Sequence, residues 1–581
     1  MTKENADNTT NHADAAYAYP LLIKQLLHTT LATCPEQQIV YGDEVRYTYW
    51  DFRHRLGQLA SVLADAGASA GDTVAVMDWD SHRYLECYFA VPMMGAVLMT
   101  VNVRLSPDQV LYTLNHSAAK VLLVHRDFLP MLESLRPRLT TVRTFILIGD
   151  DGEDAAHQAT HPAAFHGEYE ALMSASCPDY AFPDFDEHTR ATTFYTTGTT
   201  GLPKGVSFSH RQLVLHTLAG MAALGSAREQ GRVHREDVYM PITPMFHVHA
   251  WGMPYIATAM GLKQVYPGRY TPENLLRLIE REAVTFSHCV PTLLDMLLAC
   301  PAGAALDLSR WKVIVGGSPL SEGLTRAARE RGIDVYTGYG MSETCPLLTL
   351  AQARGEAGQP GDVGVRTRAG MPLPLVDLRI VDEHMRDVPR DGKSAGEVVV
   401  RAPWATQGYL GDAQASAALW AGGYLHTNDI GVIDADGYLQ ITDRIKDVIK
   451  TGGEWISSLE LENLLSTHPG VREAAVIGVQ DARWGERPLA LVVLAEGHES
   501  VTPAQLQAHI KRVAERGLIS RYAVPERLLI VESLERTSVG KINKRALRER
   551  YQDTKKETKK ETKTTRQPPK RGADPAATSR R

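Results

Sequence analysis

Short β-branched runs alternate with longer helix-like segments over most of this chain, from about Pro20 to Val400. TVAVMDW precedes a helical pattern through YLECYFAV, and VTFSHCV precedes PTLLDMLLA. KVLLVHR, RTFILIG and the glycine-ended run WKVIVGGSPL continue the series. Strands that alternate with helices are typical of parallel sheets covered by helices. The pattern therefore predicts an α/β fold.

The pattern changes after about Leu373. LVDLRIVD, GEVVVRA and GYLQIT, separated by Gly and Asp turns, predict antiparallel strands. A smaller unit follows DRIKDVIKTGGEWIS, with helices and strands of its own, and the last residues are almost free of apolar side chains. We expect a large domain over 1–445, a small domain over 446–550 and a disordered tail over 551–581.

Charge and cysteine content narrow the function classes. The 581 residues carry a net charge of −6. The tail from Tyr551 is +6, with ten Lys or Arg and four Asp or Glu, so the remaining 550 residues carry −12. An acidic body argues against nucleic-acid binding. Six scattered cysteines without a CxxC pair favour a reducing compartment. The first twenty residues do not resemble a signal peptide, so the sequence predicts a cytoplasmic protein without an integral membrane segment.

The stretch Tyr195–Gly205, YTTGTTGLPKG, is rich in groups that suit a phosphate. Its glycines permit close backbone approach, its hydroxyls and N–H groups can donate hydrogen bonds, and Lys204 adds a positive charge. A flexible surface loop is the alternative, but so many phosphate-compatible groups together favour a nucleoside triphosphate. It is not a Walker A loop, because Pro203 precedes the lysine and Gly205 follows it.

Four later segments carry further polar groups. Tyr339–Thr344 (YGMSET) offers an aromatic face, a carboxylate and two hydroxyls, and Tyr424–Gly431 places Asp429 between strand-like runs. Asp443–Asp447 is a dense charge cluster before GGEW, and Arg536–Lys541 (RTSVGK) puts a lysine after a glycine turn.

Together these motifs resemble those of adenylate-forming acyl-CoA synthetases, the group that includes medium- and long-chain fatty-acid CoA ligases. The resemblance covers roughly Pro20 to Tyr551, with the motifs in order and suitably spaced. It implies a large N-terminal domain of two parallel-type sheets plus a β-rich subdomain, followed by a small mobile α+β C-terminal domain. It also implies two half-reactions: ATP and an acid give acyl-AMP and pyrophosphate, and CoA then displaces AMP.

The resemblance implies how the nucleotide is held. The loop would clamp the β- and γ-phosphates, and Glu343 and Thr199 would hold Mg²⁺, which prefers oxygen ligands. Asp429 would accept both ribose hydroxyls. Glycine commonly precedes this aspartate in the family; Asn428 stands there instead and also tolerates unusual backbone angles. The implied ATP- and AMP-binding residues are Thr196, Thr197, Gly198, Thr199, Thr200, Lys204, Tyr339, Gly340, Met341, Ser342, Thr344, Asp429 and Arg444.

The resemblance also implies the catalytic and mobile parts. Tyr339 would stack on adenine, Thr344 would contact the α-phosphate, and Arg444 would approach the ribose and phosphates. Lys541 would reach the charge that develops between carboxylate and α-phosphate; outside its RTSVGK context it would be an ordinary surface lysine. The implied catalytic set is Lys541, Glu343, His247 and Thr199. The hinge and CoA channel are assigned to Lys446, Gly452, Gly453, Glu454 and Trp455.

Met245–Gly252 (MFHVHAWG) is the predicted start of the acyl pocket. By resemblance, His247 lies near the substrate carboxylate and Trp251 at the mouth of a tunnel; the alternative for Trp251 is core packing. A metal at the His-x-His pair is disfavoured, because no third ligand is nearby. The predicted lining is His247, Val248, Trp251, Val290, Gly316, Gly317 and Ser318. These segments contain no Lys, Arg or Asp, so an aliphatic monocarboxylate fits better than an amino acid or dicarboxylate.

The exact acid stays open at this point. Medium- and long-chain fatty-acid ligases are most similar in these segments, but ligases for short or methylthio acids such as 3-methylthiopropionate share the pattern. Two further hypotheses stay open: an adenylate-forming enzyme with a non-CoA acceptor, and a catalytically silent binding module. The predicted partners are small molecules, and dimers are common in relatives.

Overall fold

A computed structural model of the chain describes residues 17, 19–43, 45–149, 165–196, 202–228, 230–352, 362–451, 454–481, 483–517, 519–537 and 540–552. By their contacts the residues divide into two compact units. The large unit is Met1–Ile441 with Ser538–Lys541, and the small unit is Thr442–Thr537 with Ile542–Arg581.

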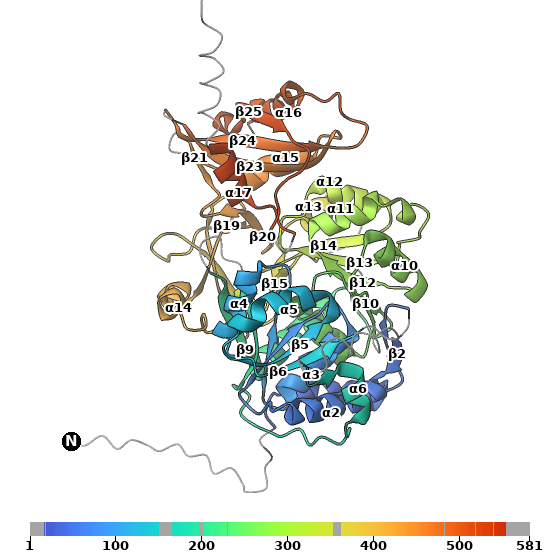
Figure 1. Ribbon diagram of the computed structural model, residues 1–581. Helices are drawn as coiled ribbons and strands as arrows, with labels where there is room; N and C mark the ends of the chain where they lie inside the picture. The colour runs from blue at the N-terminus through green and yellow to red at the C-terminus, as the bar shows by residue number, and fades with distance from the viewer. Residues whose placement is uncertain are drawn as a thin grey trace, which may run out of the picture. The chain divides into compact units, whose positions relative to one another are not determined.

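The first sheet of the large unit has seven strands (Figure 1). In spatial order they are β7 (Gly167–Glu168), β6 (Thr144–Ile148), β5 (Ala119–His125), β3 (Thr73–Met77), β4 (Val97–Thr100), β8 (Arg190–Thr196) and β9 (Lys204–Ser209). All neighbours are parallel except the hairpin β8–β9. Every residue of β3 and β4 is buried, as expected for a parallel sheet covered on both faces.

The second sheet has nine strands. They are β16 (Met371–Pro372), β15 (Leu347–Leu350), β14 (Asp334–Gly340), β13 (Lys312–Gly316), β12 (Phe286–Cys289), β10 (Val238–Pro241), β11 (Lys263–Tyr266), β1 (Gln38–Tyr41) and β2 (Val45–Thr48). The six central strands from β14 to β1 pair in parallel, and antiparallel strands complete both edges. The predicted α/β class with two parallel-type sheets is confirmed.

A third, four-stranded sheet follows. It contains β17 (Asp377–Val381), β18 (Gly396–Arg401), β19 (Leu425–Ile433) and β20 (Leu439–Arg444). The first three strands pair antiparallel, and their buried residues form a separate core around Leu378, Val398 and Leu425. This is the predicted β-rich subdomain.

The helices of the large unit cover the two large sheets, except α14, which contacts β19 of the third sheet. They are α1 (His28–Thr33), α2 (Tyr49–Asp65), α3 (His82–Met93), α4 (Pro107–His116), α5 (Leu129–Leu135), α6 (Tyr169–Ala175), α7 (His210–Ser226), α8 (Val248–Trp251), α9 (Met253–Met260), α10 (Pro272–Glu282), α11 (Pro291–Ala299), α12 (Glu322–Glu330), α13 (Asp362–Arg366) and α14 (Ala413–Leu419). Local sequence fixes several of their starts: Thr48, Ser106 and Ser209 each form a capping box with a side chain three residues later.

Helix α3 holds a special place in the large unit. All twelve of its residues are buried, and it contacts β3, β4 and β8 of the first sheet as well as β1 of the second. Its outer side packs on α2. α3 therefore lies between the two sheets.

The small unit is built on one five-stranded sheet. It comprises β22 (Glu454–Ile456), β21 (Ile449–Thr451), β24 (Gly485–Leu494), β23 (Val471–Asp481) and β25 (Arg527–Ile530), with α15 (Ser458–Ser466), α16 (Pro503–Glu515) and α17 (Lys544–Gln552). β24 and β25 are parallel and the other pairs are antiparallel. One core forms beneath α15 and α16, and another around Leu534 and Leu547. The small α+β unit was predicted; the tail predicted to be disordered lies, from Asp553 on, outside the described residues.

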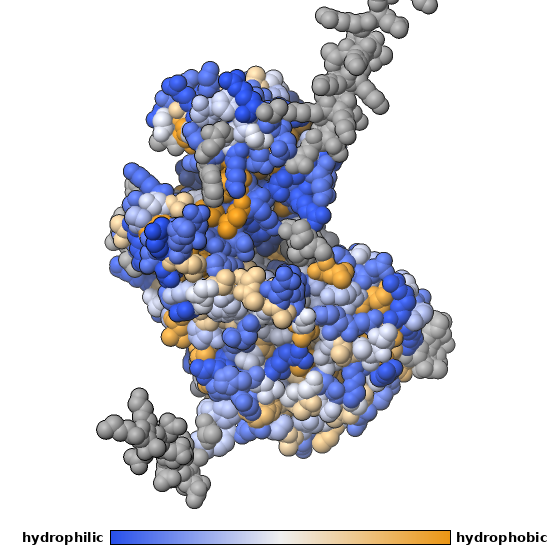
Figure 2. Space-filling view, turned by 90° about the vertical axis from the view of Figure 1, so that its left-hand side faces the viewer, coloured by the Kyte–Doolittle hydropathy of each residue, from blue (hydrophilic) through white to orange (hydrophobic). Residues whose placement is uncertain are grey.

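Exposed apolar side chains do not gather into one large patch on the face drawn in Figure 2, where hydrophilic residues predominate. The large exposed hydrophobic residues come from different elements, for example Leu202, Leu375 and Ile530. Among the described residues, no helix combines the length and apolarity needed to cross a membrane.

Candidate active site

The phosphate-loop motif lies at the turn of the β8–β9 hairpin. Thr196 and Lys204 pair across the two strands, so the hairpin fixes where the loop leaves and returns. Thr197, Gly198, Thr199 and Thr200 lie outside the described residues. The Lys204 ammonium lies 4.5 Å from the ring centroid of Tyr409, and the Leu410 N–H donates to the Gly205 carbonyl at 2.8 Å. The hairpin thus contacts the segment around Tyr409.

Tyr409 connects this lysine to the predicted metal ligand. Its hydroxyl donates to Glu343 Oε1 at 2.7 Å, and burial together with the Glu343 carboxylate raises the pKa of Tyr409. The Thr406 N–H donates to the Glu343 carbonyl at 2.8 Å, so side chain and backbone of Glu343 are both held by residues 406–409. Sequence reasoning missed Tyr409; its only local signal is an aromatic residue between the turn glycines of QGYLGD.

The YGMSET motif leaves the end of β14 as a tight turn. A Cβ placed on Gly340 would lie 1.8 Å from the Pro346 carbonyl oxygen, so only glycine fits there. Thr344 is fully buried; its hydroxyl accepts from the Met341 N–H at 3.1 Å and donates to the Pro346 carbonyl at 2.5 Å. Ser342 and Glu343 lie in the same short 3-10 turn, Ser342–Thr344. The Thr344 hydroxyl is therefore hydrogen-bonded within the turn itself.

Asp429, on β19 of the four-stranded sheet, contacts Tyr339, on β14 of the nine-stranded sheet. The Tyr339 hydroxyl donates to Asp429 Oδ2 at 2.8 Å, and the carboxylate is almost fully buried. Asn428 has φ +58°, the left-handed conformation that asparagine adopts more readily than most residues. This agrees with the expectation that Asn428 can stand where glycine is common. One hydrogen bond thus joins two residues of the predicted nucleotide site that are 90 positions apart.

The acid side is built on an unusual backbone. Val248, His249, Ala250, Trp251 and Gly252 all have positive φ, between +46° and +72°, so five consecutive residues form a left-handed turn. Left-handed conformation is costly for residues with a Cβ. Nothing in the sequence HVHAW predicted it, and only Gly252 has a residue type that favours it.

The two histidines at this turn, His247 and His249, lie in surroundings that disfavour their charged forms. His249 is fully buried, and burial lowers its pKa to about 3. Burial, with Lys541 and Arg104 as nearby positive charges, likewise lowers the pKa of half-buried His247 to about 3. Both histidines are therefore neutral near pH 7. The described residues contain no group of three or more His, Cys, Asp or Glu suited to a metal, so the His-x-His pair has no third ligand there.

Trp251 closes over the end of β13. A Cβ on Gly316 would lie 3.1 Å from the indole Cη2 and 2.5 Å from the Gly338 carbonyl oxygen, and the indole lies 5.1 Å from the His288 ring. The indole thus packs directly on Gly316. A Cβ on the next residue, Gly317, would lie 3.4 Å from Val290 Cγ1. The predicted lining residues lie at or after the ends of three strands of the nine-stranded sheet: His247, Val248 and Trp251 after β10, Val290 after β12, and Gly316, Gly317 and Ser318 at the end of β13.

Lys541 belongs by its contacts to the large unit. A Cβ on Gly317 would lie 3.1 Å from Lys541 Cε, and the Thr292 hydroxyl donates to the Gly540 carbonyl at 3.3 Å. The lysine that sequence reasoning selected is therefore next to the predicted acyl-pocket wall, although it is more than two hundred residues away in sequence.

The hinge motif lies in the small unit. Asp443 is buried, and its Oδ2 accepts from the Ser458 N–H at 2.6 Å, which anchors the segment to the start of α15. Arg444 and Lys446 are exposed. Of the predicted CoA-channel residues, Glu454 begins β22 and accepts from the Ser520 hydroxyl at 2.5 Å. Gly452 and Gly453, and the side chain of Trp455, lie outside what the structure describes.

The family comparison agrees with this geometry. The model for AMP-binding enzymes matches residues 27–410, and that for the AMP-binding enzyme C-terminal domain matches residues 460–541. The chain belongs to the AMP-binding enzyme family.

Curated relatives of this AMP-binding enzyme are ligases. A long-chain-fatty-acid–CoA ligase of Thermus thermophilus is 40% identical over 521 residues, which cover 88% of this chain and 91% of that protein. A 3-methylmercaptopropionyl-CoA ligase of Ruegeria pomeroyi is 38% identical, covering 92% and 98%. A medium-chain-fatty-acid–CoA ligase of Ectopseudomonas oleovorans is 34% identical, covering 88% and 92%.

Solved structures share the fold. The anthranilate CoA ligase AuaEII in complex with anthranoyl-AMP superposes with a TM-score of 0.81 at 23% identity, covering 92% of this chain and 99% of that one. A fatty acyl CoA synthetase of Mycobacterium tuberculosis gives a TM-score of 0.68 at 27% identity, with the same coverage. This AMP-binding enzyme is therefore an AMP-forming acid–thiol ligase that uses ATP, Mg²⁺ and CoA.

The residues present fit Mg²⁺ bound through nucleotide phosphates. Glu343 is a nearly buried carboxylate with one oxygen bonded to Tyr409, and a hard oxygen donor suits this ion. A single carboxylate is enough when phosphates supply the remaining ligands, which is the usual arrangement for Mg²⁺ with nucleotides.

Proposed function

We propose that this ligase activates an aliphatic monocarboxylic acid, with a medium- or long-chain fatty acid as the favoured substrate. The observation that carries the proposal is the pocket wall: Val248, Trp251, Val290 and Gly316 are buried and uncharged, and the nearby histidine rings are neutral. A second charged group on the substrate would be desolvated there without a partner. The relatives named for long-chain and medium-chain fatty acids support the same choice.

A short methylthio acid is the second candidate. The indole of Trp251 packs closely on Gly316, with its Cη2 atom 3.1 Å from the position of a Cβ there, and we take this bulky ring at the predicted pocket to favour a short acid. The relative named 3-methylmercaptopropionyl-CoA ligase supports it.

In the proposed first half-reaction the chain's own residues hold two anions together. Lys204 and the Thr196–Thr200 segment would hold the β- and γ-phosphates. Glu343 and Thr199 would hold Mg²⁺, which would supply positive charge to the phosphates. Tyr339, Gly340, Met341, Ser342 and Thr344 form the adenine and α-phosphate cradle, Asp429 accepts the ribose hydroxyls, and Arg444 approaches the ribose. His247 orients the carboxylate, and the Lys541 ammonium stabilises charge as the carboxylate oxygen bonds to the α-phosphorus and pyrophosphate leaves.

In the proposed second half-reaction the small unit turns about Lys446. Hinges are a few residues that absorb large changes of backbone angles. The hydrogen bond from the Ser458 N–H to Asp443 would hold the chain in place just before the exposed Lys446. Gly452, Gly453, Glu454 and Trp455 would then line the CoA channel. The CoA thiolate attacks the acyl carbonyl, and AMP leaves with the bonding electrons of the anhydride.

We also propose a cytoplasmic homodimer that acts on small molecules. Bacterial relatives and the reducing-compartment cysteine usage support the location. Size-exclusion chromatography with light scattering would test the dimer. A monomer at every concentration would refute that part alone.

The deciding experiment is an AMP-release assay with and without CoA over acids of two to eighteen carbons, including aromatic and methylthio acids. CoA-dependent AMP release that peaks with an aliphatic acid is expected. ATP–pyrophosphate exchange without CoA consumption would indicate a different acceptor. A peak with aromatic or dicarboxylic acids would contradict the uncharged, aliphatic pocket.

A further inference from the structure

Three side chains hold the backbone just before the left-handed turn. Asp80 Oδ1 accepts from the Met245 N–H at 2.7 Å, the Tyr88 hydroxyl donates to the Met245 carbonyl, and the Thr100 hydroxyl donates to the Phe246 carbonyl at 2.9 Å. All three side chains are buried. They come from the loop after β3, from α3 and from β4, so one β–α–β unit binds three polar groups of two successive residues.

The clamped residues lead directly into the acid side. His247 follows Phe246, and the left-handed residues Val248–Gly252 follow His247. A backbone in a sparsely populated region persists only when its surroundings over-determine it. The bonds from the three clamping side chains supply such a constraint from outside, at the entrance of the turn.

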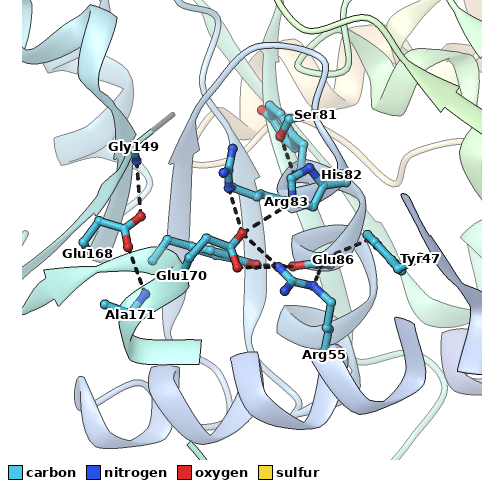
Figure 3. A network of polar contacts seen from close by, with 12 residues as sticks. Tyr47, Arg55, Ser81, His82, Arg83, Glu86, Gly149, Glu168, Glu170 and Ala171 are labelled. Atoms are coloured by element: carbon cyan, nitrogen blue, oxygen red, sulfur yellow. Dashed lines mark hydrogen bonds and ion pairs between the residues drawn. The ribbon is translucent and has the colours of Figure 1, made fainter. Parts of the chain in front are cut away.

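The clamp itself rests on a rigid base. The Asp80 backbone carbonyl accepts from the Gly268 N–H at 2.8 Å, and Ser81 caps α3 by accepting from the Tyr84 N–H at 3.1 Å. Along α3, the buried Glu86 accepts from Arg55 and Tyr47, and Arg83 pairs with Glu170, as Figure 3 shows. The whole of α3 is thereby fixed against α2 and α6.

We propose that Asp80 is a positioning residue for acid activation: its carboxylate fixes the Met245 backbone and, through it, the places of His247 and Trp251. The inference rests on the proposed function for its link to catalysis, but the clamp is a property of the structure. It extends the site to a residue that touches neither nucleotide nor acid. Its sequence signal was limited to the run WDSH before the helix.

The charge of Asp80 gives the clamp a pH dependence. Burial raises the pKa of Asp80 to about 7. The charged and titratable groups that act on it or are acted on by it are Arg104, Asp78, Tyr84, Tyr88, Tyr239, Tyr266 and Tyr270. Above this pKa the carboxylate is charged and is the stronger acceptor for the Met245 N–H. Acid activation should therefore rise as the pH increases through about 7.

The test compares Asp80→Ala, Asp80→Asn and the control Asp78→Asn. Asp78 is equally buried on the same loop but bonds Ser81 and not Met245. Hydrogen exchange of the 245–252 backbone is measured by mass spectrometry, together with KM for acid and for ATP. Asp80→Ala should speed exchange in 245–252 and lower kcat/KM for the acid by roughly 10²-fold, because small misplacements of reacting groups are costly. KM for ATP should stay within a factor of about two of the wild type.

Asp80→Asn keeps an acceptor oxygen without the charge. It should restore most of the slow exchange and most of the activity but lose the rise of activity near pH 7. Unchanged exchange in 245–252 for Asp80→Ala, or a pH rise that persists in Asp80→Asn, would overturn the proposal. Equal effects of Asp78→Asn and Asp80→Ala on KM for acid would also overturn it. A wild type that releases no AMP with any acid would refute the proposed function, while the exchange measurement would still decide the clamp.

Discussion

The predicted nucleotide side of the site, Tyr339–Thr344, and the predicted acid side, Met245–Gly252, differ in the groups that their hydrogen bonds join. On the nucleotide side two bonds join side chains, Tyr339 to Asp429 and Tyr409 to Glu343, and the Thr344 hydroxyl bonds the backbone of its own turn. On the acid side the clamping bonds reach backbone groups, and neither ring nitrogen of His249 has a hydrogen-bond partner among the described residues.

The difference follows from what each side has to receive. A triphosphate with Mg²⁺ brings charge, so fixed acceptors and cations stabilise it without rearrangement at the moment of reaction. An aliphatic chain brings none, so a wall of neutral rings and glycine backbone suits it. In the proposed function the carboxylate is the one charged group of the acid, and it would lie at the border of the two sides, where Lys541 is beside Gly317.

The largest expected effect lies at that border. Lys541→Ala should slow acyl-adenylate formation by roughly 10²-fold or more, because a preorganised cation is lost. Thioester formation from supplied acyl-AMP should be retained. Pyrophosphate exchange and single-turnover thioester assays measure the two steps, with exposed Lys511→Ala on α16 as the matched control. Full pyrophosphate-exchange activity in Lys541→Ala would show that this lysine does not act in acyl-adenylate formation.

The next effect tests how tightly the nucleotide side is built. Gly340→Ala places a methyl 1.8 Å from the Pro346 oxygen, and the required backbone shift should cost about 1–3 kcal/mol of stability. KM for ATP should rise more than KM for acid. Gly225→Ala, where a Cβ meets nothing within 4 Å, is the control and should leave both unchanged. A rise confined to the acid would contradict the division of the site.

A smaller effect is expected from Tyr409→Phe. Loss of the hydroxyl that donates to Glu343 should weaken Mg²⁺-dependent ATP binding by about tenfold, the value of one hydrogen bond to a charged group. Magnesium titrations of pyrophosphate exchange measure it. Tyr424→Phe removes a comparable bond to Asp377 at an exposed place and should have no such effect. An unchanged magnesium dependence would mean that Tyr409 does not set the Glu343 carboxylate.

The smallest effect concerns the acid side alone. The pKa of His249 is lowered to about 3 in the folded protein and is about 6.5 when unfolded. Below pH 6.5 the unfolded chain binds a proton that the folded one does not, so stability falls as pH falls, by about 1.4 kcal/mol per pH unit for this group. His249→Phe should make the decrease shallower between about pH 6.5 and 4.5, as measured by denaturant unfolding. The same slope as in the wild type, with exposed His384→Gln as control, would show that His249 is not held neutral by burial.

Local sequence determined the elements and the chemistry. Hydrophobic periodicity and capping residues set the strands and helices, and glycine at position 340 and asparagine at position 428 stand where the backbone turns require them. The motifs also indicated an adenylate-forming ligase, and the family comparison bears this out. These features depend on neighbours in the chain, so they can be deduced without knowing how the sheets pack.

Only the tertiary structure decided which distant groups meet. Tyr409 and Glu343 are 66 residues apart, and Asp80 and Met245 are 165 apart. Such pairs exist because the two sheets and α3 pack in one particular register, which no short-range pattern encodes. The left-handed turn at Val248–Gly252 has the same origin: its local preference opposes it, and the contacts around it hold it in place.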